Sequence, residues 1–230
     1  MINWSLREVK AWIPRPVLNV VRSLRRWIDS QHRFDRRFGV DTTGMINPSD
    51  LDIDPERGRE AAEYQATPPA MFKRIFESLD VDHREFVFVD LGSGKGAALL
   101  YASQFPFRRI TGVELSKRLH DIAEENIRKF RSSSMTRCLD IESRCGDATQ
   151  FDLPQEPTVL YLANPFKGQV LNRVIANVQE SLLQNPREIL IVYYHPLSRH
   201  DEWDRCSFVR YVRKEPQFSV YRATSEAELS

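Results

Sequence analysis

Hydrophobic positions change their spacing along the chain, and this change divides it into two parts. In the first 33 residues apolar side chains follow a helical period, and Ile13-Pro14-Arg15-Pro16 separates two predicted helices. The stripe of the second helix consists of Val17, Val20, Val21, Leu24, Trp27 and Ile28. From Phe34 to Pro55, glycines and prolines interrupt any period, which predicts a loop.

Beyond residue 60 the pattern alternates between short apolar runs and amphipathic stretches, which predicts a mostly parallel sheet with helices on both faces. Strands are expected at residues 86–90, 109–113, 138–144, 158–163 and 188–194. Helices are expected from residue 60, after Pro68-Pro69 to residue 79, and at residues 95–104, 116–130 and 170–183. Two further strands, 207–214 and 218–222, have no helix between them and predict an antiparallel hairpin that closes the sheet.

These elements predict one doubly wound, seven-stranded α/β domain. We expect it to span residues 60–224. A basic helical extension and linker would occupy residues 1–59, and a flexible tail residues 225–230.

A glycine-rich loop follows the first strand of the alternating region and begins the next helix. It reads Asp90-Leu91-Gly92-Ser93-Gly94-Lys95-Gly96. Glycines permit a tight turn and let the backbone approach a ligand that a Cβ atom would block. The loop alone does not identify a ligand, because NAD enzymes use a similar one and a structural turn is also compatible. Lys95 is expected to face solvent.

Three acidic residues at the carboxyl ends of predicted strands indicate which ligand the glycine loop binds. Asp90 lies where its carboxylate can receive a ligand's ammonium group. Glu114 ends the next strand, where it can accept hydrogen bonds from both hydroxyls of a ribose, at about 1.5–3 kcal/mol each. Asp147, in Gly146-Asp147-Ala148, can face an adenine amino group or cap a turn. All three lie at the edge where open α/β sheets bind ligands.

In these segments the chain resembles the class I S-adenosylmethionine-dependent methyltransferases, over roughly residues 64–222. The glycine loop resembles their first motif, Glu114 their second-strand acid, Gly146-Asp147-Ala148 their adenine-side segment, and the hairpin their sheet ending. Asp41-Thr42-Thr43-Gly44 is similar, more narrowly, to a group of bacterial methyltransferase-like proteins.

The resemblance implies S-adenosyl-L-methionine as cofactor and assigns a part of it to each segment. The methionine end would lie at Asp90 and the glycine loop, the ribose at Glu114 and the adenine at Asp147. The implied cofactor-binding residues are Asp90, Gly92, Ser93, Gly94, Gly96, Glu114, Asp147 and Ala148.

Asn164-Pro165-Phe166 follows the fourth predicted strand and is the candidate catalytic segment. It is similar to the Asn/Asp-Pro-Pro-Tyr/Phe motif of amino-group methyltransferases, with one proline in place of two. Nucleosome-directed protein lysine methyltransferases also have an asparagine- and phenylalanine-containing segment here. The asparagine oxygen can accept from an amine N–H, and the phenylalanine ring can stack on the substrate. Tyr64 is a further candidate, as a cap on the methyl pocket.

A structural role is also compatible with these residues, as a strand-ending turn with a core phenylalanine and a packed tyrosine. We therefore expect a methyltransferase whose unidentified acceptor is a nitrogen of a protein amine, a nucleobase or a small amine. A cofactor-binding scaffold without catalysis is the alternative. An NAD-dependent oxidoreductase is disfavoured by Asp90, the terminal hairpin and Asn164-Pro165-Phe166.

The net charge of +1 conceals a basic amino-terminal end, with nine Lys or Arg against three acids in residues 1–37. These helices can cover the catalytic domain with their arginines in water. They can also recruit RNA, an anionic membrane surface or a protein partner, including a second copy. Three cysteines without CxxC spacing and five histidines predict neither disulfides nor a metal site. With no apolar run of membrane-spanning length and no secretory signal, we expect a cytoplasmic protein.

Overall fold

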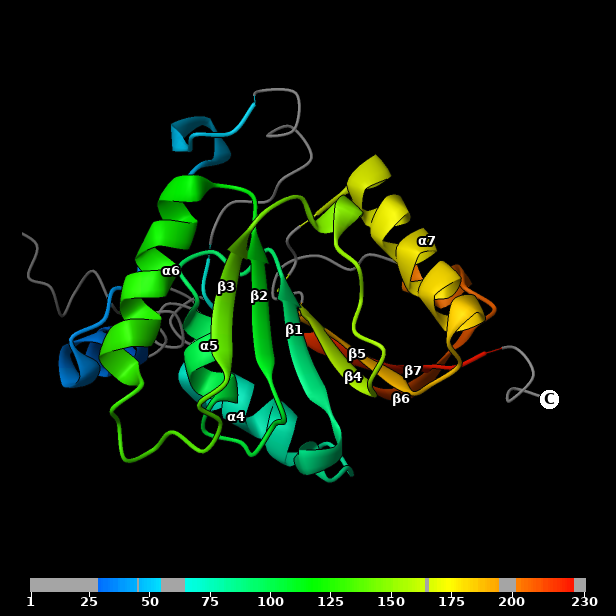
Figure 1. Ribbon diagram of the computed structural model, residues 1–230, viewed down its shortest axis with the longest axis horizontal. Coiled ribbons are helices and arrows are strands. Elements are labelled where there is room, and N and C mark those ends of the chain that lie inside the picture. The colour runs from blue at the N-terminus through cyan, green and yellow to red at the C-terminus, as the bar shows by residue number, and fades with distance from the viewer. Residues whose placement is uncertain (1–28, 45, 55–64, 164–165, 195–201, 226–230) are drawn as a thin grey trace, which may run out of the picture.

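The computed structural model describes residues 29–44, 46–54, 65–163, 166–194 and 202–225 (Figure 1). Its centre is a seven-stranded sheet with the order β3-β2-β1-β4-β5-β7-β6. The strands are β1 (Val87–Leu91), β2 (Ile110–Glu114), β3 (Ile141–Cys145), β4 (Thr158–Leu162), β5 (Ile189–Tyr194), β6 (Val209–Glu215) and β7 (Phe218–Ala223). β1 to β5 run parallel, and β7 lies antiparallel between β5 and β6. The predicted mostly parallel sheet with an antiparallel carboxyl-terminal hairpin is confirmed.

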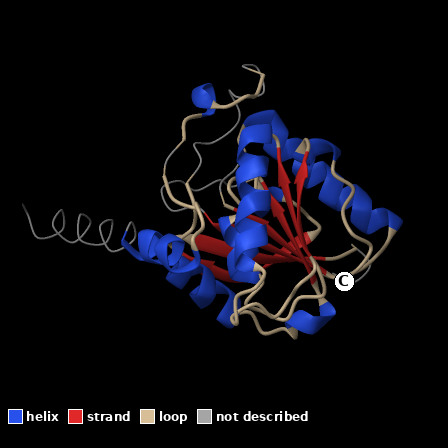
Figure 2. Cartoon of the chain, turned by 60° about the vertical axis from the view of Figure 1, so that its left-hand side comes forward, coloured by secondary structure: helices blue, strands red, loops and turns tan. Residues whose placement is uncertain are grey.

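Helices cover both faces of the sheet (Figure 2). They are α4 (Pro69–Glu77), α5 (Ala97–Ala102), α6 (Lys117–Phe130) and α7 (Gly168–Gln184), with one-turn 3-10 helices η1 (Pro48–Asp50), η2 (His83–Glu85), η3 (Ala148–Gln150) and η4 (Trp203–Arg205). Successive strand residues point to opposite faces, so Phe88 packs in the cluster of α4 and α5 while Val89 packs in that of α7. Because both faces are covered, β1, β2, β4 and β5 are buried along their whole length.

The strand order reverses between β1 and β4. Asp90 of β1 pairs with Gly112 of β2 on one side and with Tyr161 of β4 on the other. In open α/β sheets such a reversal leaves a crevice at the carboxyl ends of the strands, where ligands bind. This topology puts Asp90 and the loop after it at the centre of that edge.

The helix before this core extends further than its sequence predicts. Residues 29–38 are helical, so the expected loop from Phe34 is wrong for its first five residues. Phe34 and Phe38, one turn apart, lie against Phe130 with ring centroids 5.5 and 4.7 Å away, and Gly39 ends the helix at φ 66°. Packing against the core therefore extends the helix beyond the point at which the sequence pattern predicts a loop. Of the two helices predicted in the first 33 residues, residues 29–33 at the end of the second are helical, and residues 1–28 lie outside the described part.

The third strand begins later than predicted. β3 starts at Ile141 rather than residue 138, because the backbone N–H groups of Arg137 and Cys138 donate to the carbonyl of Ser103 at the end of α5. Apolar character alone does not reveal that these groups are already satisfied. Among the residues that the structure describes, every helix is too short or too polar to span a lipid bilayer.

Candidate functional site

A cavity of about 190 Å³ lies at the carboxyl ends of the central strands. Its wall combines the loops after β1, β2, β3 and β4 with two segments from before the sheet. Eight of the predicted site residues meet in this wall: Asp90, Gly92, Ser93, Gly94, Glu114, Asp147, Ala148 and Phe166. Residues from four separate stretches of sequence thus face one space.

Asp90 presents a buried carboxylate oxygen without a hydrogen-bond partner to the cavity. The residue is 2% exposed, and its unpartnered oxygen is Oδ1. Burial, with a further contribution from the charge of Glu114, raises the pKa of Asp90 well above the usual range of an aspartate. A buried polar atom without a partner is costly. A cationic N–H donor in the cavity would satisfy this oxygen.

Glu114 holds the glycine loop in shape. Its Oε2 atom accepts from the backbone N–H of Gly94 at 2.8 Å, and its Oε1 atom from that of Ser116 at 2.9 Å. Burial raises the pKa of Glu114, and these backbone donors act in the opposite direction. Each carboxylate oxygen can accept more than one hydrogen bond, so the group keeps capacity for a ligand hydroxyl.

The glycine loop depends on conformations and clearances that only glycine provides. Gly92 and Gly94 have φ values of 80° and 54° and line the cavity. Gly96, a predicted cofactor residue, is instead the N-cap of α5 at φ 78°, and it is not among the lining residues. A Cβ atom there would lie 3.0 Å from that of Ala123, so Gly96 allows α5 and α6 to approach.

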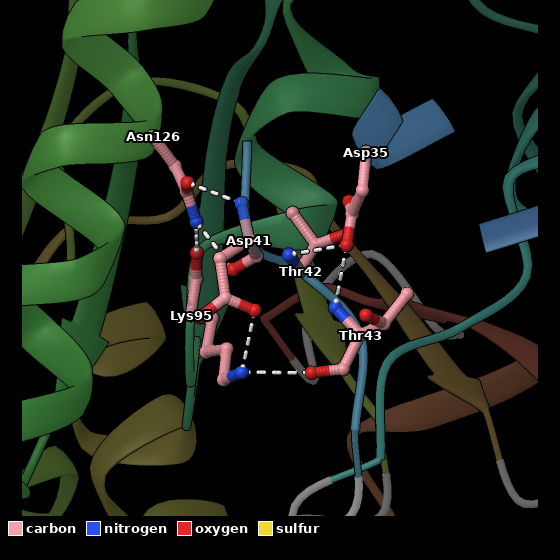
Figure 3. A network of polar contacts seen from close by, with 6 residues as sticks. All are labelled: Asp35, Asp41, Thr42, Thr43, Lys95 and Asn126. Atoms are coloured by element: carbon pink, nitrogen blue, oxygen red, sulfur yellow. Dashed lines mark hydrogen bonds and ion pairs between the residues drawn. The ribbon is translucent and has the colours of Figure 1, made fainter. Parts of the chain in front are cut away.

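Lys95, within the same loop, was predicted to face solvent, and this prediction is wrong. Its side chain is 8% exposed, and its Nζ atom lies 2.7 Å from the Asp41 carboxylate and donates to the Thr43 carbonyl at 2.7 Å (Figure 3). The partner is more than fifty residues earlier in the chain, so no local pattern could reveal it.

Asp147 caps a short helix while it lines the cavity. Its Oδ1 atom accepts from the backbone N–H of Thr149 at 2.8 Å and from the Thr149 hydroxyl at 2.7 Å. This is the cap that the sequence offers as its alternative for Asp147. Ala148, the next residue, is buried in the same wall.

The candidate catalytic residues lie partly beyond the described ranges. Phe166 is half-buried, packs against the α7 side of the core and lines the cavity. Asn164, Pro165 and Tyr64 lie outside the described residues. The hydroxyls of Thr67 and Tyr161 are 2.5 Å apart, and both residues line the cavity. This bond fastens the segment before α4 to β4.

Several lining residues were missed by motif reading. They include Leu51, Ile53, Gln65, Ala66 and Tyr161. Tyr161 stands in the strand before Asn164 and could have been suspected from that position. Nothing in the sequence marks Leu51 and Ile53, which come from the predicted linker. In the described parts of the chain, no group of three His, Cys, Asp or Glu side chains could hold a metal ion.

The chain is similar to known methyltransferases in part of its sequence and in its fold. The family model described as Histone methylation protein DOT1 matches residues 60–140. No curated protein matches the chain. A methyltransferase dependent on S-adenosylmethionine from Aquifex aeolicus is 15% identical, with 78% of this chain and 99% of that chain covered and a TM-score of 0.50. The Escherichia coli protein yhhF is 14% identical, with coverages of 79% and 99% and a TM-score of 0.51.

An RNA methyltransferase from Salinibacter ruber, solved with S-adenosylhomocysteine, is 24% identical over 70% of this chain and 93% of that chain, at a TM-score of 0.47. The likenesses to the Aquifex and Escherichia proteins establish the fold. The family match falls on the segment that holds the glycine loop, Asp90 and Glu114.

Proposed function

We propose that this chain, a class I S-adenosylmethionine-dependent methyltransferase, transfers the methyl group to a nitrogen, and first of all to a protein amine. The observation that carries the cofactor half of this proposal is the unpartnered Oδ1 atom of Asp90 beside the glycine loop. The family match to Histone methylation protein DOT1 supports the protein amine.

The residues of the cavity fit the cofactor. Asp90 would accept from the ammonium group of its methionyl end, which meets the need of the buried oxygen for a cationic donor. Glu114 would accept from the ribose, while it keeps its bond to Gly94. Asp147 would face the adenine amino group, and Leu115 and Leu119 add apolar side chains to the wall of the cavity.

S-adenosylmethionine supplies an electrophilic methyl group on a positively charged sulfur. The chain's own task is then to hold a neutral amine in line with that methyl group, an alignment that can contribute roughly 7–11 kcal/mol. Asn164 is the proposed acceptor of the amine N–H groups. Phe166, in the cavity wall, would present its ring to the positive charge that develops on the nitrogen.

A labelled-methyl transfer assay tests the acceptor. The purified chain is incubated with radiolabelled S-adenosylmethionine and, separately, with histones, nucleosomes, a mixed protein extract and total RNA. Label on protein amines is the expected result. Label on RNA alone would overturn the protein amine, and no transfer to any acceptor together with intact cofactor binding would favour a non-catalytic scaffold.

The Asn164→Ala variant tests the catalytic segment. It should abolish transfer and leave the affinity for S-adenosylhomocysteine nearly unchanged, because Asn164 is assigned to the acceptor. Asn185→Ala is the matched control, since Asn185 ends α7 and donates to the Gln155 carbonyl away from the cavity. Transfer at the normal rate by Asn164→Ala would show that the segment is structural.

A further inference from the structure

The predicted linker supplies part of the cavity wall through Leu51 and Ile53. Two sets of polar contacts join it to α6, one at each end of this stretch of the linker. Asp41 contacts Asn126 in the later part of α6, and Asp41 and Thr43 contact Lys95 of the glycine loop (Figure 3). Asp52 contacts the start of α6. The motif Asp41-Thr42-Thr43-Gly44 belongs to the first of these contacts.

The first tie joins this segment to the glycine loop. The Asn126 side chain accepts from the backbone N–H of Asp41 at 2.8 Å and donates to the carbonyls of Asp41 and Lys95 at 2.7 and 2.9 Å. The Asp41 carboxylate pairs with Lys95, and that of Asp35 accepts from Thr42 and Thr43. One amide therefore holds both the linker and the loop.

The second tie is made by Asp52, whose carboxylate contacts the N-terminus of α6. Its Oδ1 atom accepts from the Ser116 hydroxyl at 2.5 Å, and its Oδ2 atom from the backbone N–H of Arg118 at 3.2 Å. The Ser116 hydroxyl in turn accepts from the N–H of Leu119 at 3.2 Å. These contacts lower the pKa of Asp52, so its carboxylate stays charged against the positive end of the helix.

Leu51 and Ile53 flank Asp52 and line the cavity. Exposure alternates along this stretch, with Leu51 and Ile53 half-buried and Asp52 exposed. Leu115 and Leu119, which follow Glu114, line the same cavity. The contact of Asp52 with the α6 N-cap thus sets where the two apolar side chains stand.

We infer that Leu51 and Ile53 are cofactor-binding residues, and that Asp52 is a positioning residue that holds them against the adenosine half of S-adenosylmethionine. The inference rests on the proposed cofactor and adds a wall that the resemblance does not assign. Docking of residues 50–54 on α6 should then raise the affinity for the cofactor, and cofactor binding should stabilise that docking by the same free energy.

Calorimetric titration with S-adenosylhomocysteine tests the inference on the full-length chain. Asp52→Ala and the double variant Leu51→Ala, Ile53→Ala should each raise the Kd about five- to tenfold, the lower end of typical coupling between sites. Asp52→Asn keeps one of the two acceptor oxygens and loses the charge, so it should recover only part of the affinity. Asp82→Ala is the matched control, since exposed Asp82 also accepts from a backbone N–H two residues on, at the start of η2, and it does not line the cavity.

Hydrogen exchange supplies a second readout that a general loss of stability would not reproduce. S-adenosylhomocysteine should protect the amides of residues 50–54 in the wild-type chain and should protect them less in Asp52→Ala. If the wild-type chain does not bind S-adenosylhomocysteine, the proposed function fails. If the wild-type chain binds and the Asp52 and Leu51/Ile53 variants bind equally well, the cofactor proposal stands and this inference is overturned.

Discussion

The carboxylate of Glu114 accepts a hydrogen bond from the backbone N–H of Gly94 at 2.8 Å, twenty residues earlier in the chain. Its other oxygen accepts from Ser116, the N-cap of α6. One buried carboxylate therefore joins the end of β2 to both the glycine loop and a helix start. The shape of the loop and the binding capacity of Glu114 cannot be altered independently.

Glu114→Ala should raise the Kd for S-adenosylhomocysteine at least about tenfold and should also destabilise the fold. Two buried N–H groups lose their acceptor, at about 1–3 kcal/mol each. Calorimetry and thermal unfolding measure the two effects. Glu142→Ala is the control, since the half-exposed Glu142 carboxylate bonds Thr111 and Arg144 on β2 and β3. Unchanged affinity in Glu114→Ala would refute the ribose assignment.

Asp90→Asn should raise the melting temperature at neutral pH while it removes cofactor affinity. Because the pKa of Asp90 is raised on folding, the folded chain holds the proton more tightly than the unfolded chain. The stability from this proton is present in acid and is lost as the pH rises from the unfolded to the folded pKa. Asparagine avoids that loss. A lower melting temperature for Asp90→Asn would contradict this account.

The affinity for S-adenosylhomocysteine should rise with pH while Asp90 ionises and then level off. An ammonium group pairs with the charged carboxylate, so binding to the protonated form must release a proton. Titrations from acid to neutral pH in buffers of different ionisation enthalpy measure both the affinity and the released proton. A chain that binds equally well across this range, with no proton release, would place the ammonium group elsewhere.

Gly112→Ala should reduce both stability and cofactor affinity, because the new Cβ atom would lie 2.7 Å from Leu99 Cδ1 and from Ser93 Oγ in the glycine loop. Overpacking of this kind costs about 1–3 kcal/mol. Gly146→Ala is the matched control for stability alone, since a Cβ atom there would meet nothing within 4 Å but Gly146 lines the cavity. Urea unfolding of both variants measures the difference, and equal midpoints would show that the loop yields without cost.

Asp41→Ala should destabilise the chain more than Lys95→Met does. The Lys95 side chain is 8% exposed and that of Asp41 is 59% exposed. Removing Asp41 leaves a buried ammonium group without its charged partner, whereas removing Lys95 leaves a carboxylate that water can reach. We expect a difference of about 1–3 kcal/mol in the free energy of unfolding, measured from urea midpoints at constant slope. The reverse order would contradict the exposure argument.

The sequence predicts the α/β sheet well, because buried parallel strands and amphipathic helices leave strong local patterns. Asp90 and Glu114 could also be placed in one cavity, since parallel strands end at the same edge. Lys95 could not be placed, because its burial depends on Asp41, which the sequence puts in a loop. Leu51 and Ile53 could not be placed for the same reason, because they line the cavity from a stretch that the sequence puts in a loop.

The most direct test of the central claim is parallel calorimetric titration of the purified chain with S-adenosylmethionine, S-adenosylhomocysteine and NADH. The account predicts saturable one-to-one binding of both adenosyl compounds and no binding of NADH. Selective binding of NADH, or failure of both adenosyl compounds to bind, would contradict it.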